Sequence, residues 1–215
     1  MWPSSLRKSF DKIAQSYLEN TVNDLSLKNR TPAPSQALVA QKSGKLVTAK
    51  RLYVPSAEDM FHAENFGALS KSDQILHNAQ SSGITLISHK AARAITHSFD
   101  DLTSAKLEME KAIEGLSPDF SCFMGWAAVF SNYVVLVPSN DDREALSEQN
   151  EHILGHFGRR VNGTFRTIHH FSVHYTDNPL EAQSVKNELN SNLNLGPNFN
   201  FGPAKVDTRN AKIRS

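Results

Sequence analysis

The chain has 215 residues, of which 39% are hydrophobic and 21% charged, a size that corresponds to one domain with a sizeable core. Its 23 basic and 22 acidic residues give a formal net charge of +1 without long blocks of one sign, so charge does not favour nucleic acid or an anionic membrane as partner. Cys122 is the only cysteine, which excludes an intrachain disulfide, and no apolar stretch reaches membrane-spanning length. We therefore expect a soluble protein of the cytoplasm or another intracellular compartment.

The first part of the chain predicts a helix, a hairpin and a second helix. Apolar residues recur at helical spacing over 6–18. The segments 36–41 and 45–53 have the composition of two strands joined by a turn at Gly44. A helix containing residues 62–64 follows and extends to about residue 80.

The rest of the chain alternates between predicted strands and helices. Strands are expected over 84–87, 133–138 and 164–176, and helices over 89–99, 104–116, 122–130, 141–161 and 179–193. Residues 1–195 therefore predict a single α/β domain, a three-layer sandwich with one mixed β-sheet flanked by helices. Residues 196–215 have no periodic pattern and are expected to form an extended or disordered tail.

The triplet His62-Ala63-Glu64, in a predicted helix, is the main functional motif. A histidine two residues before a glutamate can place a metal ligand and a general acid/base in one small site. Together with the preceding hairpin, this triplet resembles the first half of the cytidine deaminase superfamily, over roughly residues 5–90. The resemblance implies a zinc ion that activates water, with His62 as a ligand and Glu64 as the residue that transfers protons.

The resemblance also implies two cysteine ligands in a Pro-Cys-x-x-Cys segment, and a single cysteine cannot supply both. In one register, residues 118–122 take this place, Asp119 and Cys122 bind zinc, and residues 89–117 contain a helical insertion. In the other register, Lys90 and Arg93 occupy the region of the ligands, and no metal binds. Both registers remain open.

The same resemblance places Arg51 and Tyr53 where related deaminases hold the ribose, as substrate-binding residues. It therefore implies a divergent zinc-dependent hydrolytic deaminase that acts on a nucleobase-containing substrate. The alternative is a binding or assembly module, built either on an inactive deaminase fold or on an unrelated α/β domain. The sequence leaves open whether the chain is an enzyme and whether it forms a homo-oligomer.

Several histidines lie outside this motif. His152 and His156 are four residues apart on a predicted helix, but no glutamate follows His152 to complete an HExxH metal motif. In the strand predicted over 164–176, His170 and His174 share one face and His169 lies on the other. The sequence His174-Tyr175-Thr176 resembles half of a two-histidine phosphodiesterase motif, but the chain has no second HxT, and this interpretation is set aside.

Overall fold

The computed structural model describes residues 44–55, 71–79, 82–161, 165, 167–192 and 198–210. Strands and helices alternate through this part of the chain, so the predicted α/β class is confirmed. In chain order the elements are β1 (Lys45–Val54), α4 (Lys71–Asn78), β2 (Gly83–Thr85), α5 (His89–His97), α6 (Leu102–Ile113), β3 (Phe120–Phe130), β4 (Tyr133–Pro138), α7 (Asn140–Phe157), the 3-10 turn η2 (Gly158–Arg160), β5 (Phe171–Tyr175), α8 (Pro179–Asn192) and β6 (Asn198–Asn210).

The six described strands form a closed barrel in the order β1-β2-β5-β4-β3-β6. All pairings between them are antiparallel. The predicted mixed sheet, and with it the three-layer deaminase sandwich, is therefore wrong. The strand expected over 36–41 lies outside the described residues, and β1 pairs with β2 and β6.

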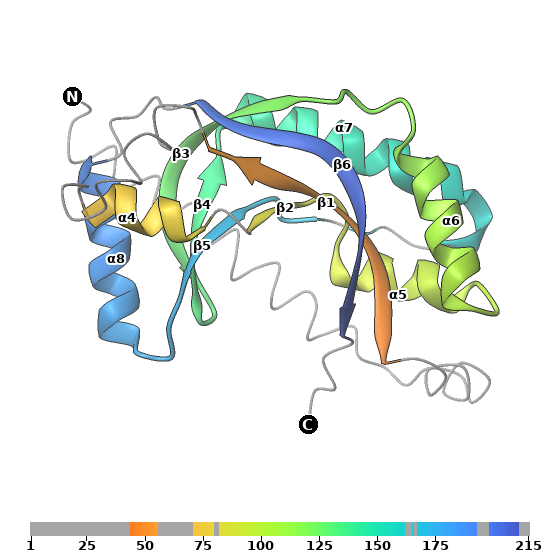
Figure 1. Ribbon diagram of the computed structural model, residues 1–215, viewed down its shortest axis with the longest axis horizontal. Helices are drawn as coiled ribbons and strands as arrows, with labels where there is room; N and C mark the ends of the chain where they lie inside the picture. Colours follow the sequence, from red (N-terminus) through yellow and green to blue (C-terminus); the bar gives the residue numbers. More distant parts are fainter. Residues whose placement is uncertain are drawn as a thin grey trace.

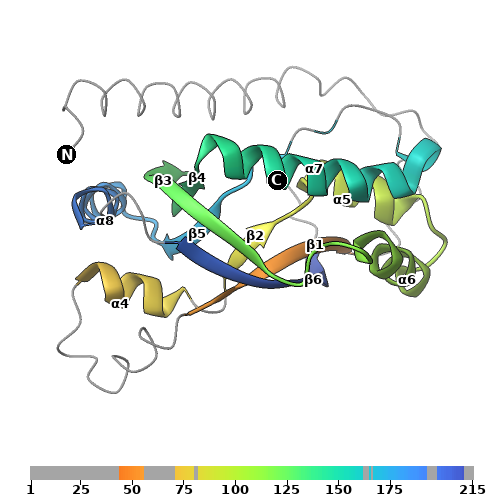
Figure 2. The ribbon, with the colours of Figure 1, turned by 90° about the horizontal axis from the view of Figure 1, so that it is seen from above.

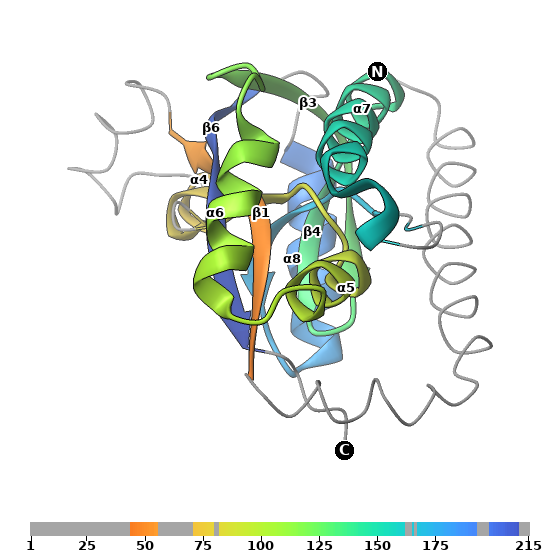
Figure 3. The same ribbon diagram turned by 90° about the vertical axis from the view of Figure 1, so that its right-hand side faces the viewer.

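The helices gather at two ends of the barrel. Figure 1 shows α4 and α8 at one end and α5 and α6 at the other, and Figure 2 shows the same division from above, with α7 running alongside the strands. Figure 3 looks at the end that carries α5 and α6. Three of these helices begin at a side chain that accepts a backbone N–H, as helix N-caps do: Ser88, Asp101 and Ser139.

Strand β3 replaces the helix predicted over 122–130. The apolar run in this segment fits a buried strand as well as a buried helix, and only the tertiary pairing distinguishes the two. Here β3 pairs with β4 over most of its length and with β6 over residues 120–123. The reversal between β3 and β4 occurs at Ser131, whose φ of 54° lies in the left-handed region.

Strand β6 occupies most of the segment predicted as an extended or disordered tail. It pairs with β1 along nearly the whole length of β1 and with the start of β3, so it closes the barrel. Its buried residues Phe199 and Phe201 alternate with exposed Asn198 and Asn200, which is the period of a half-buried strand. Residues 198–210 therefore belong to the same packed unit as the other strands.

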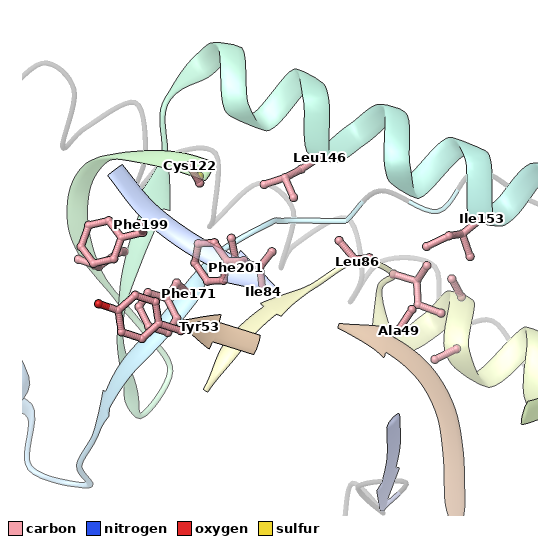
Figure 4. Packing of buried hydrophobic residues seen from close by; sticks show 14 of the residues in the cluster. Ala49, Tyr53, Ile84, Leu86, Cys122, Leu146, Ile153, Phe171, Phe199 and Phe201 are labelled. Atoms are coloured by element: carbon pink, nitrogen blue, oxygen red, sulfur yellow. The ribbon is translucent and has the colours of Figure 1, made fainter. Parts of the chain in front are cut away.

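The core fills the barrel and continues beneath α7. Figure 4 shows the aromatic rings of Tyr53, Phe171, Phe199 and Phe201 packed together, with Leu146 of α7 above them. The ring centroids of Phe171 and Phe201 are 5.4 Å apart at an interplanar angle of 90°, the edge-to-face arrangement that aromatic pairs prefer. None of the described helices is both long and apolar enough to cross a membrane.

Candidate nucleotide site

The two residues of the HAE motif that carried the deaminase prediction, His62 and Glu64, lie outside the described residues. The other proposed zinc ligands are described. Cys122 is fully buried in β3, and burial raises the pKa of its thiol well above the ordinary range, with Asp142 adding to the shift. Zinc binds the thiolate form of cysteine, so this environment opposes metal binding.

Asp119 lies just before β3 and is exposed. Among the described residues, no three side chains of histidine, cysteine, aspartate or glutamate are grouped so that they could hold a metal ion. Together with the buried, protonated thiol of Cys122, this overturns the prediction of a zinc cofactor.

Arg51, expected to bind substrate, is fully buried. Its guanidinium donates to Gln149 Oε1 at 2.9 Å, to Gly202 O at 3.0 Å and to Ser117 O at 2.9 Å. Burial lowers the pKa of Arg51, and the Asp119 carboxylate partly opposes the shift. These contacts join β1 to α7, β6 and the segment before β3, so in this structure Arg51 connects elements of the fold.

Tyr53, the second expected substrate residue, lies in the aromatic core. Its ring centroid is 5.1 Å from that of Phe171 and 5.8 Å from that of Phe199. Both Arg51 and Tyr53 alternate with Lys50 and Leu52 along β1, so they point to the core side of the strand. Lys50 and Leu52 point to the other side of the strand.

A polar group on that other side joins β2, β5 and β6. Ile84 of β2 pairs with Phe171 of β5, and both side chains are buried in the core. Extending this antiparallel register by one residue in each direction places His170, just before β5, opposite Thr85, and Ser172 opposite Gly83. The side chains of Thr85, His170 and Ser172 alternate with those of Ile84 and Phe171 and so point to the other face. We call Thr85, His170 and Ser172, together with Arg209 of β6, the β2–β5 site.

The tautomer of His170 follows from its hydrogen bond. Its Nδ1 lies 2.8 Å from Ile168 O, and because a carbonyl oxygen can only accept, Nδ1 carries the proton. In the neutral ring, Nε2 then holds the lone pair. Burial lowers the pKa of His170, the bond to Ile168 O opposes this, and the positive charge of Arg209 lowers it further. Protonation of His170 is therefore less favourable than that of a solvent-exposed histidine.

Arg209 connects β6 to this histidine and to Thr85. Its Nη2 donates to Thr85 Oγ1 at 2.7 Å, and its charge acts on His170. The side chain of Arg209 is 46% exposed, so its guanidinium remains accessible to solvent and to a ligand. An arginine, a histidine and two hydroxyls close together are groups that proteins use to bind phosphate.

A cluster of buried and partly buried apolar residues adjoins the site. The ring centroid of Phe130 lies 5.4 Å from that of His170. Phe130 belongs to a second, smaller hydrophobic cluster that is separate from the main core and contains Ala128, Val135, Val137, Trp126, Tyr133 and Ile168. An aromatic ring beside a phosphate-binding group is the arrangement on which a nucleobase can stack.

Gly83 limits the chemistry of the site. A Cβ atom at this position would lie 1.9 Å from Arg51 O and 2.8 Å from Arg51 C, both backbone atoms. No side chain fits there without moving β1. The site therefore has a histidine on the β5 side, at His170, and no matching side chain on the β2 side opposite Ser172.

The neighbouring histidines have structural contacts. Buried His169 has its Nδ1 3.2 Å from Thr85 O, and burial lowers its pKa to about 4. His174 Nε2 lies 2.9 Å from Glu181 Oε1, and Thr176 donates to Glu181 Oε2 at 2.8 Å. The HxT sequence at His174 thus ties the end of β5 to the first turn of α8.

The sequence placed His170 and His174 on one face but did not single out His170-Phe171-Ser172. An HxS sequence in an alternating strand was the available signal. The sequence could not identify the residues that lie near His170, because Thr85 and Arg209 come close to it only through the pairing of β2, β1 and β6.

No family model matches the chain, and no curated protein matches it. Among solved structures, it is similar to Usb1 from Kluyveromyces marxianus, with 10% identity and a TM-score of 0.43, over 78% of this chain and 94% of that chain. A second structure, the same Usb1 with uridine monophosphate, has 9% identity and a TM-score of 0.40, over 79% and 95% of the two chains. These values are too low to transfer an activity to this chain.

The resemblance to cytidine deaminases is therefore corrected. The sheet is an antiparallel barrel, Cys122 lies in a strand instead of at the start of a helix, and the described residues lack a metal-binding group. The zinc deaminase function falls with this assignment, and the alternative of an unrelated α/β domain fits better.

Proposed function

We propose that the chain is a nucleotide-binding domain that holds a phosphate at the β2–β5 site and stacks the base against Phe130. The observation that carries the proposal is the contact of Arg209 with Thr85 beside His170. It supports the proposal because Thr85 of β2, Arg209 of β6 and His170, just before β5, come from separate parts of the chain and lie close together. A nucleobase-containing ligand was also expected from the sequence, although for a different reaction.

The chemistry of each group suits this ligand. Arg209 offers a planar set of N–H donors to phosphate oxygens, and the hydroxyls of Thr85 and Ser172 can donate as well. His170 can take up a proton when an anion approaches and then becomes a second cation. The ring of Phe130 supplies a face for stacking, an interaction worth about 1–3 kcal/mol per base.

A second candidate function is cleavage of a phosphodiester at the same site. The tautomer of His170 favours it, since Nε2 is available in the neutral ring to accept a proton from an attacking hydroxyl. The departing oxygen then needs a proton from a second group. The absence of a side chain at Gly83 leaves the β2 side without such a group among the described residues, so binding is the better supported function.

Titration calorimetry with uridine monophosphate, uridine and inorganic phosphate tests the proposal. We expect the nucleotide to bind at least about tenfold more tightly than uridine, since a charge-assisted hydrogen bond contributes about 1.5–3 kcal/mol. Arg209→Gln and His170→Ala should each weaken nucleotide binding and leave the weak binding of uridine nearly unchanged.

Lys71→Gln is the matched control, because Lys71 is exposed at the start of α4, at the end of the barrel away from α5 and α6. Its affinity for the nucleotide should equal that of the wild type. Equal affinities for uridine and uridine monophosphate, or no binding of either, would refute the proposal. Incubation with an oligouridylate separates the candidates: His170-dependent cleavage would establish the second one.

A further inference from the structure

The face that carries the β2–β5 site continues across β1 onto β6 with basic side chains. Lys50 of β1 pairs with Thr85 of β2 on one side and with Lys205 of β6 on the other. Directly paired residues point to the same face of a sheet. Thr85, Lys50 and Lys205 therefore lie in a line across three strands, and the register of β2 with β5 places His170, just before β5, next to Thr85.

Two more charges lie on the same face of β6. Asp207 and Arg209 are two and four residues after Lys205, so the alternation of the strand places them on its side. We call Lys50, Lys205, Arg209 and Asp207 the basic row. Its formal charge is +2, which exceeds the +1 of the entire chain.

Asp207 holds two of the basic side chains in position. Its Oδ2 lies 3.0 Å from Lys50 Nζ and 3.6 Å from Arg209 Nε. Arg209 is also fixed by its bond to Thr85. Lys50 and Arg209 are therefore held in place before any ligand arrives, which lowers the entropic cost of binding.

The distance from His170 of the β2–β5 site to Lys205 of the basic row exceeds what one phosphate needs. Adjacent strands are about 4.8 Å apart, so the distance from His170 on the β5 side to Lys205 on β6 is about 14 Å. A stacked nucleic-acid strand carries one phosphate about every 3.4 Å along its axis. The row therefore has room for more than one phosphate.

We propose that the basic row binds the phosphates next to the nucleotide held at the β2–β5 site, so that the ligand is a single-stranded polynucleotide. This inference rests on the proposed nucleotide binding and extends it from one nucleotide to several. The chain as a whole gave no sign of such a ligand, because its formal net charge is only +1.

The test compares uridine monophosphate with a six-nucleotide oligouridylate, by competition in fluorescence anisotropy at several salt concentrations. For single strands, the slope of log affinity against log salt is about −0.7 for each phosphate neutralised. We expect the slope for the hexamer to be steeper than that for the mononucleotide by about 1–2.

Lys205→Gln separates the row from the β2–β5 site, because Lys205 is not part of that site. This variant should bind the hexamer severalfold more weakly, with a salt slope reduced by about 0.7, and should bind uridine monophosphate as the wild type does. Lys71→Gln removes an equal charge away from the row and should change neither affinity.

The outcomes separate the two proposals. Binding of uridine monophosphate with equal affinity and equal salt slope for the hexamer overturns the polynucleotide inference and leaves nucleotide binding in place. The polynucleotide inference is also overturned if Lys205→Gln and Lys71→Gln affect the hexamer equally. If neither ligand binds, both proposals fail together.

Discussion

Replacing Gly83 by alanine should destabilise the protein far more than the same replacement at Gly44 or Gly155. The added Cβ would lie 1.9 Å from Arg51 O, and β1 would have to retreat by about 1 Å to reach even 3.0 Å. Two backbone hydrogen bonds between β1 and the ends of β2 flank this point. Tyr53 N donates to Ser82 O at 3.0 Å, and Leu86 N donates to Ala49 O at 2.9 Å.

The magnitude follows from these contacts. Overpacking of a tight site costs about 1–3 kcal/mol. Each of the two flanking hydrogen bonds contributes about 1 kcal/mol, and a displacement of 1 Å would lose most of both. We therefore expect Gly83→Ala to lower the free energy of unfolding by about 3–5 kcal/mol, a large share of the 5–15 kcal/mol typical of a domain.

Urea denaturation followed by circular dichroism measures this change as a shift in the transition midpoint at constant slope. Gly44→Ala is one control, since nothing lies within 4 Å of its added Cβ, and it should change stability by less than about 0.5 kcal/mol. Gly155→Ala is a second control within α7, also in open space, and should stabilise by about 0.5–1 kcal/mol. A loss below about 1 kcal/mol for Gly83→Ala would refute the claim that this position admits no side chain.

Four further outcomes are expected. Arg51→Met should lower the free energy of unfolding by about 1–3 kcal/mol, since it leaves the buried Gly202 O without its donor; an unchanged urea midpoint would contradict this. The pKa of His169 falls from 6.5 to about 4 on folding, so its neutral form contributes stability that is complete above pH 6.5 and is lost as the pH falls through 4. At 1.36 kcal/mol per pH unit this amounts to about 3 kcal/mol, measurable by thermal melts at pH 7 and pH 4 and absent in His169→Gln. The dinucleotide UpU, whose phosphodiester keeps its charge, should bind more tightly as the pH is lowered, because the bound anion favours the protonated form of His170; a flat profile would show that His170 does not face the phosphate. Cys122 should react with a thiol reagent only after denaturant is added, and rapid labelling of the native protein would contradict its burial.

Helices and strands with strong local signals were predicted well from the sequence. The helix formers before residue 116 gave α6, the proline at 179 marked the start of α8, and the β-branched run at 133–138 gave β4. These elements depend on local propensity and capping, which a single sequence contains. The conformation of β3 does not depend on local propensity, because its apolar run became a strand only through pairing with β4 and β6.

The candidate site was largely hidden for the same reason. Its four members come from β2, β6, β5 and the residue before β5, and their proximity follows from a register that the sequence does not state. The predicted strand included His170, whereas β5 begins at Phe171, and nothing in the chain linked His170 to Arg209. The deaminase resemblance failed because it rested on a short triplet and on one cysteine, whose burial depends on the tertiary fold.

The closure of the barrel by β6 has a consequence for how the protein is made. Since β1 and β6 are far apart in the sequence, their pairing gives the fold a high contact order, and such topologies fold in milliseconds to seconds. A ribosome adds about 5–20 residues per second, so β3 waits several seconds for its β6 partner while residues 131–197 are synthesised. During that time the edges of β1 and β3 have unpaired backbone groups that can recruit other strands. The nascent chain is thus most exposed to aggregation, and to capture by chaperones, just before β6 emerges.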